Sequence, residues 1–369
     1  MIMCFLYIFL SFVISVTLAM IVIPRLLIFA ANHSLYDEQD ERKKHIGDVP
    51  RIGGVSFIPS ILLATMFVLG LFYMFEGRFD FTSRYPNHSE LYFLFCSSLF
   101  LYLGGVKDDL VGMRYRYKFV IQIISSAIIT FSGLFINNFY GLFGIYEISP
   151  WVGMPLTLFL LVFIINSINL IDGLDGLVSS ISFFAFCVYG TLFLLNGSWV
   201  YTVIAISSIG VLIPFFYYNV FGNAKKGSKI FMGDSGSQTL GLILGFLAIR
   251  FARFDPQVVV PYSNAFVIAI SPLLVPILDV FRVILARMKR KQSIFEADRS
   301  HIHHKLLKYG LDDSSAMIFL LFISSLFCIL NFVLMFHLNT LKIFAIDITL
   351  WTLINIYISF HITKKRIPT

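Results

Sequence analysis

Residues 159–171 read FLLVFIINSINLI, an apolar run that contains only three polar side chains. The strands of a transmembrane β-barrel would instead alternate apolar and polar residues over segments of about ten positions. Because this run does not alternate, it predicts a helix. Similar apolar runs recur along the whole chain, and a helix of about 20 such residues crosses a hydrocarbon core about 30 Å thick.

The composition excludes a water-soluble fold. Of the 369 residues, 58% are hydrophobic and 13% are charged, whereas a soluble domain carries about 25% charged residues. We predict one all-α transmembrane transferase domain over residues 1–369, a polytopic integral membrane protein with about eleven spans. The predicted spans are 3–31, 53–75, 90–106, 119–136, 151–171, 177–195, 199–221, 238–252, 263–286, 314–337 and 343–361.

Lysine and arginine gather in the loops on one side of these spans. Five segments hold 21 of the 28 Lys and Arg residues. They are 32–51, 107–118, 222–237, 287–313 and 362–369. Loops rich in Lys and Arg face the cytoplasm, which predicts an inner-membrane protein with its N-terminus outside and its C-terminus in the cytoplasm. The same loops, together with 172–176, hold most of the acids and histidines, so catalytic loops are expected on the cytoplasmic side.

Two adjacent acids, Asp108 and Asp109, follow the third span in GGVKDDLVGMRYRYK, residues 104–118. Three cations, the last of them Lys118, precede the next span. Carboxylates beside cations suit a site for Mg²⁺ and phosphate. A solvated loop would carry the same residues, so the pattern leaves both interpretations open.

The segment NSINLIDGLDGL, residues 166–177, repeats a polar residue every three positions: Asn166, Asn169, Asp172 and Asp175. A helix turns about 100° per residue, so the first three form a slowly rotating polar stripe on an apolar span. Polar groups inside a membrane are functional by default. The asparagines alone would also suit packing between helices, but that alternative does not explain the two acids.

The loop KKGSKIFMGDSGS, residues 225–237, presents Asp234 among glycines and serines, with three lysines upstream. Backbone N–H groups in such a turn bind an anion, while the carboxylate is able to hold a metal ion. The spacing of a Walker loop is absent. An ordinary glycine turn with one solvated acid is the alternative.

Three histidines, His301, His303 and His304, follow Arg299 in the largest basic loop. No Cys or suitably spaced carboxylate completes a structural zinc site, so binding of phosphate or sugar hydroxyls is favoured.

The first basic loop carries Arg42, Lys43 and His45 before Pro50 and two glycines. This loop is either a solvated anchor, as basic loops beside anionic headgroups often are, or part of a phosphate site. The sequence does not decide between the two.

In their order along the chain, these motifs resemble the polyprenyl-phosphate N-acetylhexosamine-1-phosphate transferases of glycosyltransferase family 4. The resemblance spans nearly the whole chain through RKxH…PxxGG, VKDDxxGxRxRxK, NxxNxxDGxDGL, FMGDSGS and DRxHxHHxL. The histidine motif is similar to the branch that makes undecaprenyl-diphospho-N-acetylglucosamine, rather than to the UDP-MurNAc-pentapeptide translocase with its HHH-type signature.

The resemblance implies a role for each matched residue. The implied metal ligands are Asn169 and Asp234, which would hold Mg²⁺, with Mn²⁺ as the alternative ion. The implied catalytic residues are Asp108, Asp109 and Lys118. The implied substrate-binding residues are Arg42, Lys43, His45, Asn166, Asp172, Asp175, Arg299, His301, His303 and His304. Among these, Lys118 and Arg299 would contact the diphosphate, Asp175 the uridine and His301 the donor sugar.

The expected reaction moves N-acetylglucosamine-1-phosphate from UDP-GlcNAc to undecaprenyl phosphate and releases UMP, as the first membrane step of a cell-surface polysaccharide pathway. UDP-GalNAc, UDP-FucNAc and UDP-MurNAc-pentapeptide remain alternative donors. A secondary transporter is the rival of another class, because carriers also place Asn and Asp inside helices. The expected partners are the UDP-sugar, the polyprenyl phosphate and the bilayer, with no nucleic acid, and a homodimer is left open.

Overall fold

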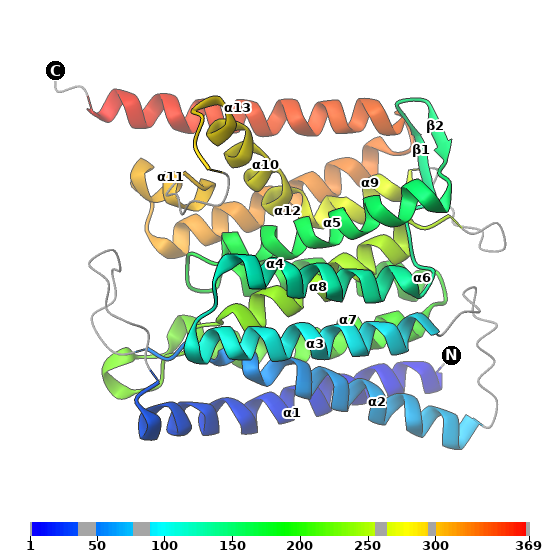
Figure 1. The fold of residues 1–369 in the computed structure, drawn as a ribbon, viewed down its shortest axis with the longest axis vertical. Coiled ribbons are helices and arrows are strands. Elements are labelled where there is room, and N and C mark those ends of the chain that lie inside the picture. Colours follow the sequence, from blue (N-terminus) through cyan, green and yellow to red (C-terminus); the bar gives the residue numbers. More distant parts are fainter. Residues whose placement is uncertain (1, 36–48, 77–88, 255–263, 294–299, 367–369) are drawn as a thin grey trace.

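The computed structural model describes residues 2–35, 49–76, 89–254, 264–293 and 300–366. Within these residues, ten helices are long and apolar enough to cross a membrane, and they run side by side in one bundle (Figure 1). The described helices of 16 residues or more are α1 (Ile2–His33), α2 (Phe57–Glu76), α3 (Ser89–Val111), α4 (Tyr115–Phe131), α5 (Pro150–Ile171), α6 (Leu177–Leu195), α7 (Trp199–Phe216), α8 (Asp234–Ala252), α10 (Leu274–Lys289), α12 (Asp313–Leu334) and α13 (Thr340–Arg366). The predicted all-α class is confirmed.

Shorter elements connect these helices. They are α9 (Ala265–Ile270), α11 (Ile302–Tyr309), the 3-10 helices η1 (Gly53–Ser56), η3 (Ala224–Lys226) and η4 (Ser271–Leu273), the π-helix η2 (Tyr217–Phe221), and the strands β1 (Asn138–Leu142) and β2 (Ile145–Glu147). The two strands pair antiparallel, and this hairpin is the only sheet among the described residues. An all-α prediction did not include it.

Ten of the eleven predicted spans coincide with the ten candidate membrane helices. The remaining one, 119–136, is α4, which has only 17 residues. At about 1.5 Å per residue its length is about 26 Å, less than the hydrocarbon core of about 30 Å. The helix ends early because the chain turns at Gly133, whose φ is +86°. The α4 helix nevertheless lies against both α3 and α5.

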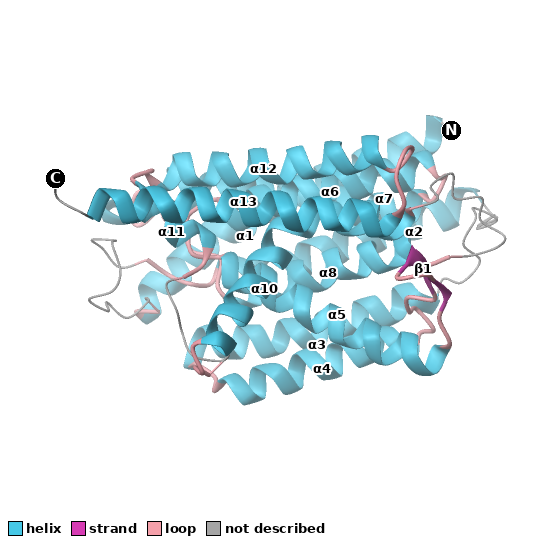
Figure 2. Ribbon diagram, turned by 90° about the horizontal axis from the view of Figure 1, so that it is seen from above, coloured by secondary structure: helices cyan, strands magenta, loops and turns pink. Residues whose placement is uncertain are grey.

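The α8 helix is the centre of the bundle. All of its residues are buried, and Figure 2 shows it inside, with α3, α4 and α5 on one side and α6, α12 and α13 on the other. A helix that is buried on every side can carry polar groups only where partners satisfy them. The polar residues of its first turns therefore mark where partners from other helices must converge.

The described residues among those singled out from the sequence gather at one end of the bundle. The last turns of α3 and α5 and the first turns of α4 and α8 meet at the left of Figure 1. The start of α1 and the end of α13 lie at opposite ends of the bundle in the same view. The α10 helix takes a different direction from α9 after η4, which contains Pro272, because proline interrupts helical hydrogen bonding.

Candidate active site

The start of α8 is clamped by the segment that precedes α2. The Phe231 N–H donates to Pro50 O at 2.9 Å, the Gly53 N–H to Phe231 O at 2.9 Å, and the Gly54 N–H to Met232 O at 2.7 Å. The two segments therefore pair like short strands. A Cβ on Gly54 would lie 2.1 Å from the backbone nitrogen of Gly236, so only glycine permits this close approach.

Asp109 caps the N-terminus of α8 from the neighbouring helix α3. Its Oδ1 accepts from the Asp234 N–H at 2.6 Å, and its Oδ2 accepts from the Ser235 N–H at 3.0 Å and from Ser235 Oγ at 2.5 Å. A carboxylate at this position satisfies free N–H groups and faces the positive end of the helix dipole. Asp109 thus fixes Asp234 in place.

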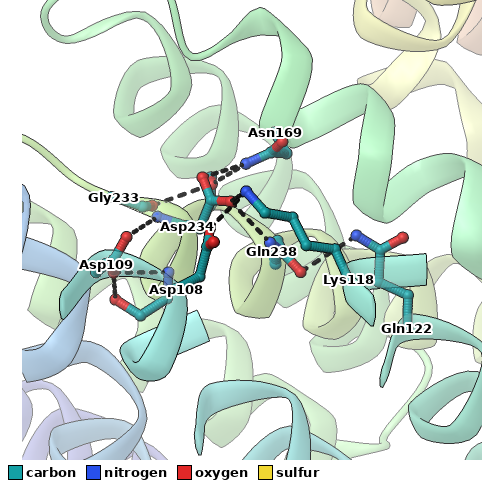
Figure 3. Close-up of polar contacts among 10 residues, drawn as sticks. Asp108, Asp109, Lys118, Gln122, Asn169, Gly233, Asp234 and Gln238 are labelled. Carbon is teal, nitrogen blue, oxygen red and sulfur yellow. Dashed lines mark hydrogen bonds and ion pairs between the residues drawn. The ribbon is translucent and has the colours of Figure 1, made fainter. Parts of the chain in front are cut away.

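Lys118 bridges Asp108 and Asp234, which together with Asp109 form an acidic cluster (Figure 3). Its Nζ lies 2.5 Å from Asp108 Oδ2 and 2.6 Å from Asp234 Oδ2. Asp234 also accepts from Asn169 Nδ2 at 3.1 Å and from Gln238 Nε2 at 3.2 Å. The side chains predicted from three separate motifs therefore meet at Asp234.

The cluster has the composition of a divalent-cation site. One carboxylate oxygen from each of Asp108, Asp109 and Asp234 lies within 4.8 Å of the others, and carboxylate oxygens are the ligands that Mg²⁺ prefers. Three ionised acids around Lys118 would carry a net negative charge, which a cation would neutralise. Asn169 directs its NH₂ group at Asp234, so coordination through its oxygen requires a rotated amide. The donor set fits the ion that the family resemblance implies.

A buried chain of amides supports the cluster from behind. Gln122 Nε2 donates to Gln238 Oε1 at 3.2 Å, and Asn166 Nδ2 donates to Gln122 Oε1 at 2.6 Å. Asn166, which was predicted to bind substrate, contacts Gln122 and the Val162 carbonyl, and its predicted role stays a prediction. The sequence analysis missed both glutamines, although a glutamine within an apolar helix is a signal of the same kind as Asn166.

The loop after α5 lies beside the cluster. Burial raises the pKa of Asp172 to about 7, with Arg51 opposing this shift and neighbouring acids adding to it. Asp175 pairs with Lys229 at 2.6 Å. Asp172 therefore shares the electrostatic environment of the acid cluster.

Asn219, in the π-helix η2, ties this loop to the segment before α8. Its Oδ1 accepts from the Gly176 N–H at 2.7 Å, and its Nδ2 donates to Ile230 O at 2.8 Å. Single-turn π-helices are frequent at functional sites. No motif drew attention to Asn219, because the sequence around it reads as the end of an ordinary apolar span.

The histidines pack against the same loop. His303 is buried, and a Cβ on Gly173 would lie 2.3 Å from its Nε2. Burial lowers the pKa of His303 to about 3, so its ring is neutral at pH 7. The rings of His301 and His303 are stacked with centroids 5.9 Å apart, and those of His303 and His304 are 4.2 Å apart. His301 also contacts Asp279 of α10, a residue that the sequence analysis missed.

Four predicted substrate-binding residues, Arg42, Lys43, His45 and Arg299, lie outside the described residues. Their predicted roles therefore stay predictions. The other predicted residues come from α3, α4, α5, the 172–176 loop, α8 and the region around α11, and those of α3, α4, α5 and α8 form one connected network.

Fold and cluster together define a polytopic membrane protein with a largely buried, acid-rich site at one end of its bundle. Residues 91–252 match the model of a protein family described as glycosyl transferase family 4. The matched region runs from α3 to the end of α8 and contains Asp108, Lys118, Asn169 and Asp234. Residues 91–252 are thus similar to glycosyl transferase family 4, and the predicted family resemblance is confirmed.

Curated proteins extend the similarity over most of the chain. The chain is 26% identical over 300 residues to the undecaprenyl-phosphate alpha-N-acetylglucosaminyl 1-phosphate transferase of Yersinia pestis, covering 80% of this chain and 76% of that protein. The protein of the same name from Escherichia coli (strain K12) is 26% identical over 287 residues, 77% of this chain and 72% of that protein. A "probable undecaprenyl-phosphate N-acetylglucosaminyl 1-phosphate transferase" of Bacillus subtilis is 28% identical over 340 residues, 92% of this chain and 88% of that protein.

Proposed function

We propose that this protein transfers N-acetylglucosamine-1-phosphate from UDP-GlcNAc to undecaprenyl phosphate, giving undecaprenyl-diphospho-GlcNAc and UMP. The observation that carries the proposal is the convergence of Asp108, Lys118, Asn169 and Asp234 at one end of a membrane bundle. The names of the similar proteins supply the donor sugar and the lipid. A phosphorylated lipid and a water-soluble nucleotide sugar are able to meet only at a membrane surface.

The proposed reaction is a direct displacement at phosphorus. An oxygen of the lipid phosphate attacks the phosphorus that carries the sugar, a new P–O bond forms, and the bond between that phosphorus and the bridging oxygen breaks as UMP leaves. Phosphoryl transfer depends mainly on positioning and charge neutralisation. A bound Mg²⁺ would neutralise the diphosphate and would be held by Asp234, Asn169 and the neighbouring acids.

Lys118 and Asp108 have complementary parts in this proposal. The second pKa of a phosphate monoester is about 6, so the lipid phosphate is largely ionised at pH 7 and needs little help from a base. Asp108, which lies 2.5 Å from Lys118, then serves to orient the ammonium group. Lys118 is the described cation best placed to meet phosphate oxygens, because it already bridges Asp108 and Asp234.

The proposal also orients the protein in the membrane. The end of the bundle that holds the cluster also carries the basic segments around Lys118, Lys229 and Arg287. Under the positive-inside rule this end faces the cytoplasm, where nucleotide sugars are made. The bacterial inner membrane, with the N-terminus outside, follows as part of the same proposal.

A donor panel tests the function. Purified full-length protein in detergent is incubated with Mg²⁺, undecaprenyl phosphate and, separately, UDP-GlcNAc, UDP-GalNAc and UDP-MurNAc-pentapeptide, and UMP release is measured. UMP is expected from UDP-GlcNAc, with loss of at least about 100-fold in excess EDTA and recovery on adding Mg²⁺, because the ion neutralises transition-state charge. UMP from another donor alone would change the assigned substrate, and none from any donor would favour the transporter.

A further inference from the structure

Asp279, on α10, is a buried acid that no motif contains. Only 1% of it is exposed. Its Oδ2 lies 2.8 Å from His301 Nδ1, and its Oδ1 accepts from the Ile302 N–H at 3.0 Å and from Arg282 Nη2 at 2.7 Å. A buried carboxylate with three partners is stabilised in its ionised form by those donors. Two of these contacts reach the start of α11, and the third, with Arg282, lies within α10.

The contacts hold the start of α11 against α10 in a fixed position. Ile302 is the first residue of α11, so Asp279 receives one of the N–H groups that a helix leaves unpaired at its N-terminus. Arg282 Nη2 also donates to Ser300 O at 2.6 Å. Residues 300–302 are thereby held against α10 by the Ser300 carbonyl, the His301 ring and the Ile302 N–H.

The same geometry sets the tautomer of His301. An ionised carboxylate only accepts hydrogen bonds, so the ring nitrogen facing Asp279 must carry the proton. Nδ1 is therefore the donor, and in the neutral ring Nε2 is left as an acceptor. A histidine held in this way is able to accept a hydrogen bond from a hydroxyl or amide N–H group of a ligand. A ring free to change tautomer would offer that acceptor only part of the time.

His301 is also connected to the acid cluster. Its ring stacks on His303 with an interplanar angle of 10°, and His303 lies against Gly173. Gly173 follows Asp172, whose electrostatic neighbours include Asp109 and Asp234. A ligand that reaches from the acids toward α11 would therefore meet the His301 ring.

We infer that Asp279 is a positioning residue for the donor: it fixes His301 with Nε2 free to accept a hydrogen bond from the hydroxyl or N-acetyl group of a UDP-N-acetylhexosamine. This inference rests on the proposed function, since it assigns part of the same site. It predicts that Asp279 affects use of the nucleotide sugar and not use of the lipid phosphate. It also predicts that the effect passes through His301.

The test compares Asp279→Asn, His301→Ala and the double variant in purified full-length protein. In Asp279→Asn the amide oxygen is able to keep the hydrogen bonds from the Ile302 N–H and from Arg282. The new NH₂ group faces His301 and favours the tautomer in which Nδ1 is the acceptor. An Asp-to-Asn change beside a catalytic histidine has the same effect. KM for UDP-GlcNAc is expected to rise about tenfold or more, by analogy with metal-binding histidines, where loss of the supporting partner costs about 10-fold to 100-fold. KM for undecaprenyl phosphate should not change.

The double variant separates positioning from a merely structural role. If Asp279 acts through His301, Asp279→Asn adds no further loss to His301→Ala, because residues that act as a unit are not additive. Asp347→Asn is the matched control. Asp347 is also a fully buried acid, on α13, and accepts a hydrogen bond from Asn331 at 3.0 Å. In Asp347→Asn, KM for UDP-GlcNAc and KM for undecaprenyl phosphate should both stay as in the wild type.

Three results would overturn the inference. One is an unchanged KM for UDP-GlcNAc in Asp279→Asn while the wild type is active, which leaves the proposed function intact. Another is a full additional loss in the His301→Ala background. The third is a wild type that releases no UMP from any donor, which removes the proposed function and this inference with it.

Discussion

Replacing Asp234 with alanine is expected to lower the rate of UMP release on the order of a thousandfold or more, with the helices still folded. Asp234 contacts Lys118, Asn169 and Gln238 at the start of α8. Its removal leaves Lys118 and any bound ion without their central partner, and the loss of one preorganised electrostatic contact alone costs about 100-fold to 1,000-fold. The measurement is kcat for UMP release at saturating substrates.

Asp312→Ala is the control for this change. Asp312 is likewise an acid at the start of a helix, since its side chain accepts from the Ser315 N–H at the N-terminus of α12. Its replacement should lower the stability only slightly through the lost cap, without changing kcat. An Asp234→Ala variant that keeps more than a tenth of the wild-type rate would contradict the place of Asp234 at the centre of the site.

Gly54→Ala is expected to destabilise the protein by roughly 3 kcal/mol or more and to abolish most activity, because it forces two backbones apart. The new Cβ would lie 2.1 Å from Gly236 N and 2.2 Å from Gly236 Cα. Neither backbone atom is able to move without shifting the first turn of α8, where Asp234 lies. The thermal unfolding midpoint in detergent and the rate of UMP release would both fall.

Gly70→Ala is the matched control in the following helix, α2. A Cβ on Gly70 meets nothing within 4 Å, and alanine favours a helix interior over glycine by about 1 kcal/mol. This variant should be as stable as the wild type or slightly more stable, and equally active. Equal behaviour of Gly54→Ala and Gly70→Ala would show that the close approach of η1 to α8 does not support the site.

The helices could be predicted because their signal is local. Apolar runs of the right length specify spans, and all but one of the predicted spans are long enough to cross a membrane in the structure. The exception, α4, depends on the turn at Gly133 and on packing against α3 and α5. The hairpin β1–β2 depends on pairing between residues such as Asn138 and Glu147, which no apolar periodicity reveals.

The site was partly predictable for a related reason. Asp108, Lys118, Asn169 and Asp234 stand in motifs whose residue types are unusual in a membrane protein, and the structure brings them together. The partners that each of these residues contacts come from segments far away in the sequence. The pairing of Asp109 with the N-terminus of α8 joins residues 125 apart in sequence, and nothing near Asp109 indicates it.

Other residues were missed because their own sequence contexts are plain. Gln122, Asn219 and Asp279 are each isolated polar residues in an apolar stretch of helix, whereas Gln238 directly follows the FMGDSGS motif without being part of it. Only the tertiary contacts show that Asn219 joins two loops and that Asp279 holds His301. A search for every strongly polar side chain within the predicted spans would have named all four, without indicating what each one contacts.

The central claim is that the cluster around Asp234 supports transfer of a sugar together with its phosphate. The most direct measurement uses UDP-GlcNAc labelled with ³²P at the phosphorus that carries the sugar, incubated with the full-length protein, Mg²⁺ and undecaprenyl phosphate, followed by extraction of the lipid. The account predicts label in the lipid fraction with an equal amount of unlabelled UMP in the aqueous fraction, and loss of both in Asp234→Ala. Labelled UDP in the aqueous fraction beside a glycosylated lipid would contradict it, because the sugar would then have moved without its phosphate.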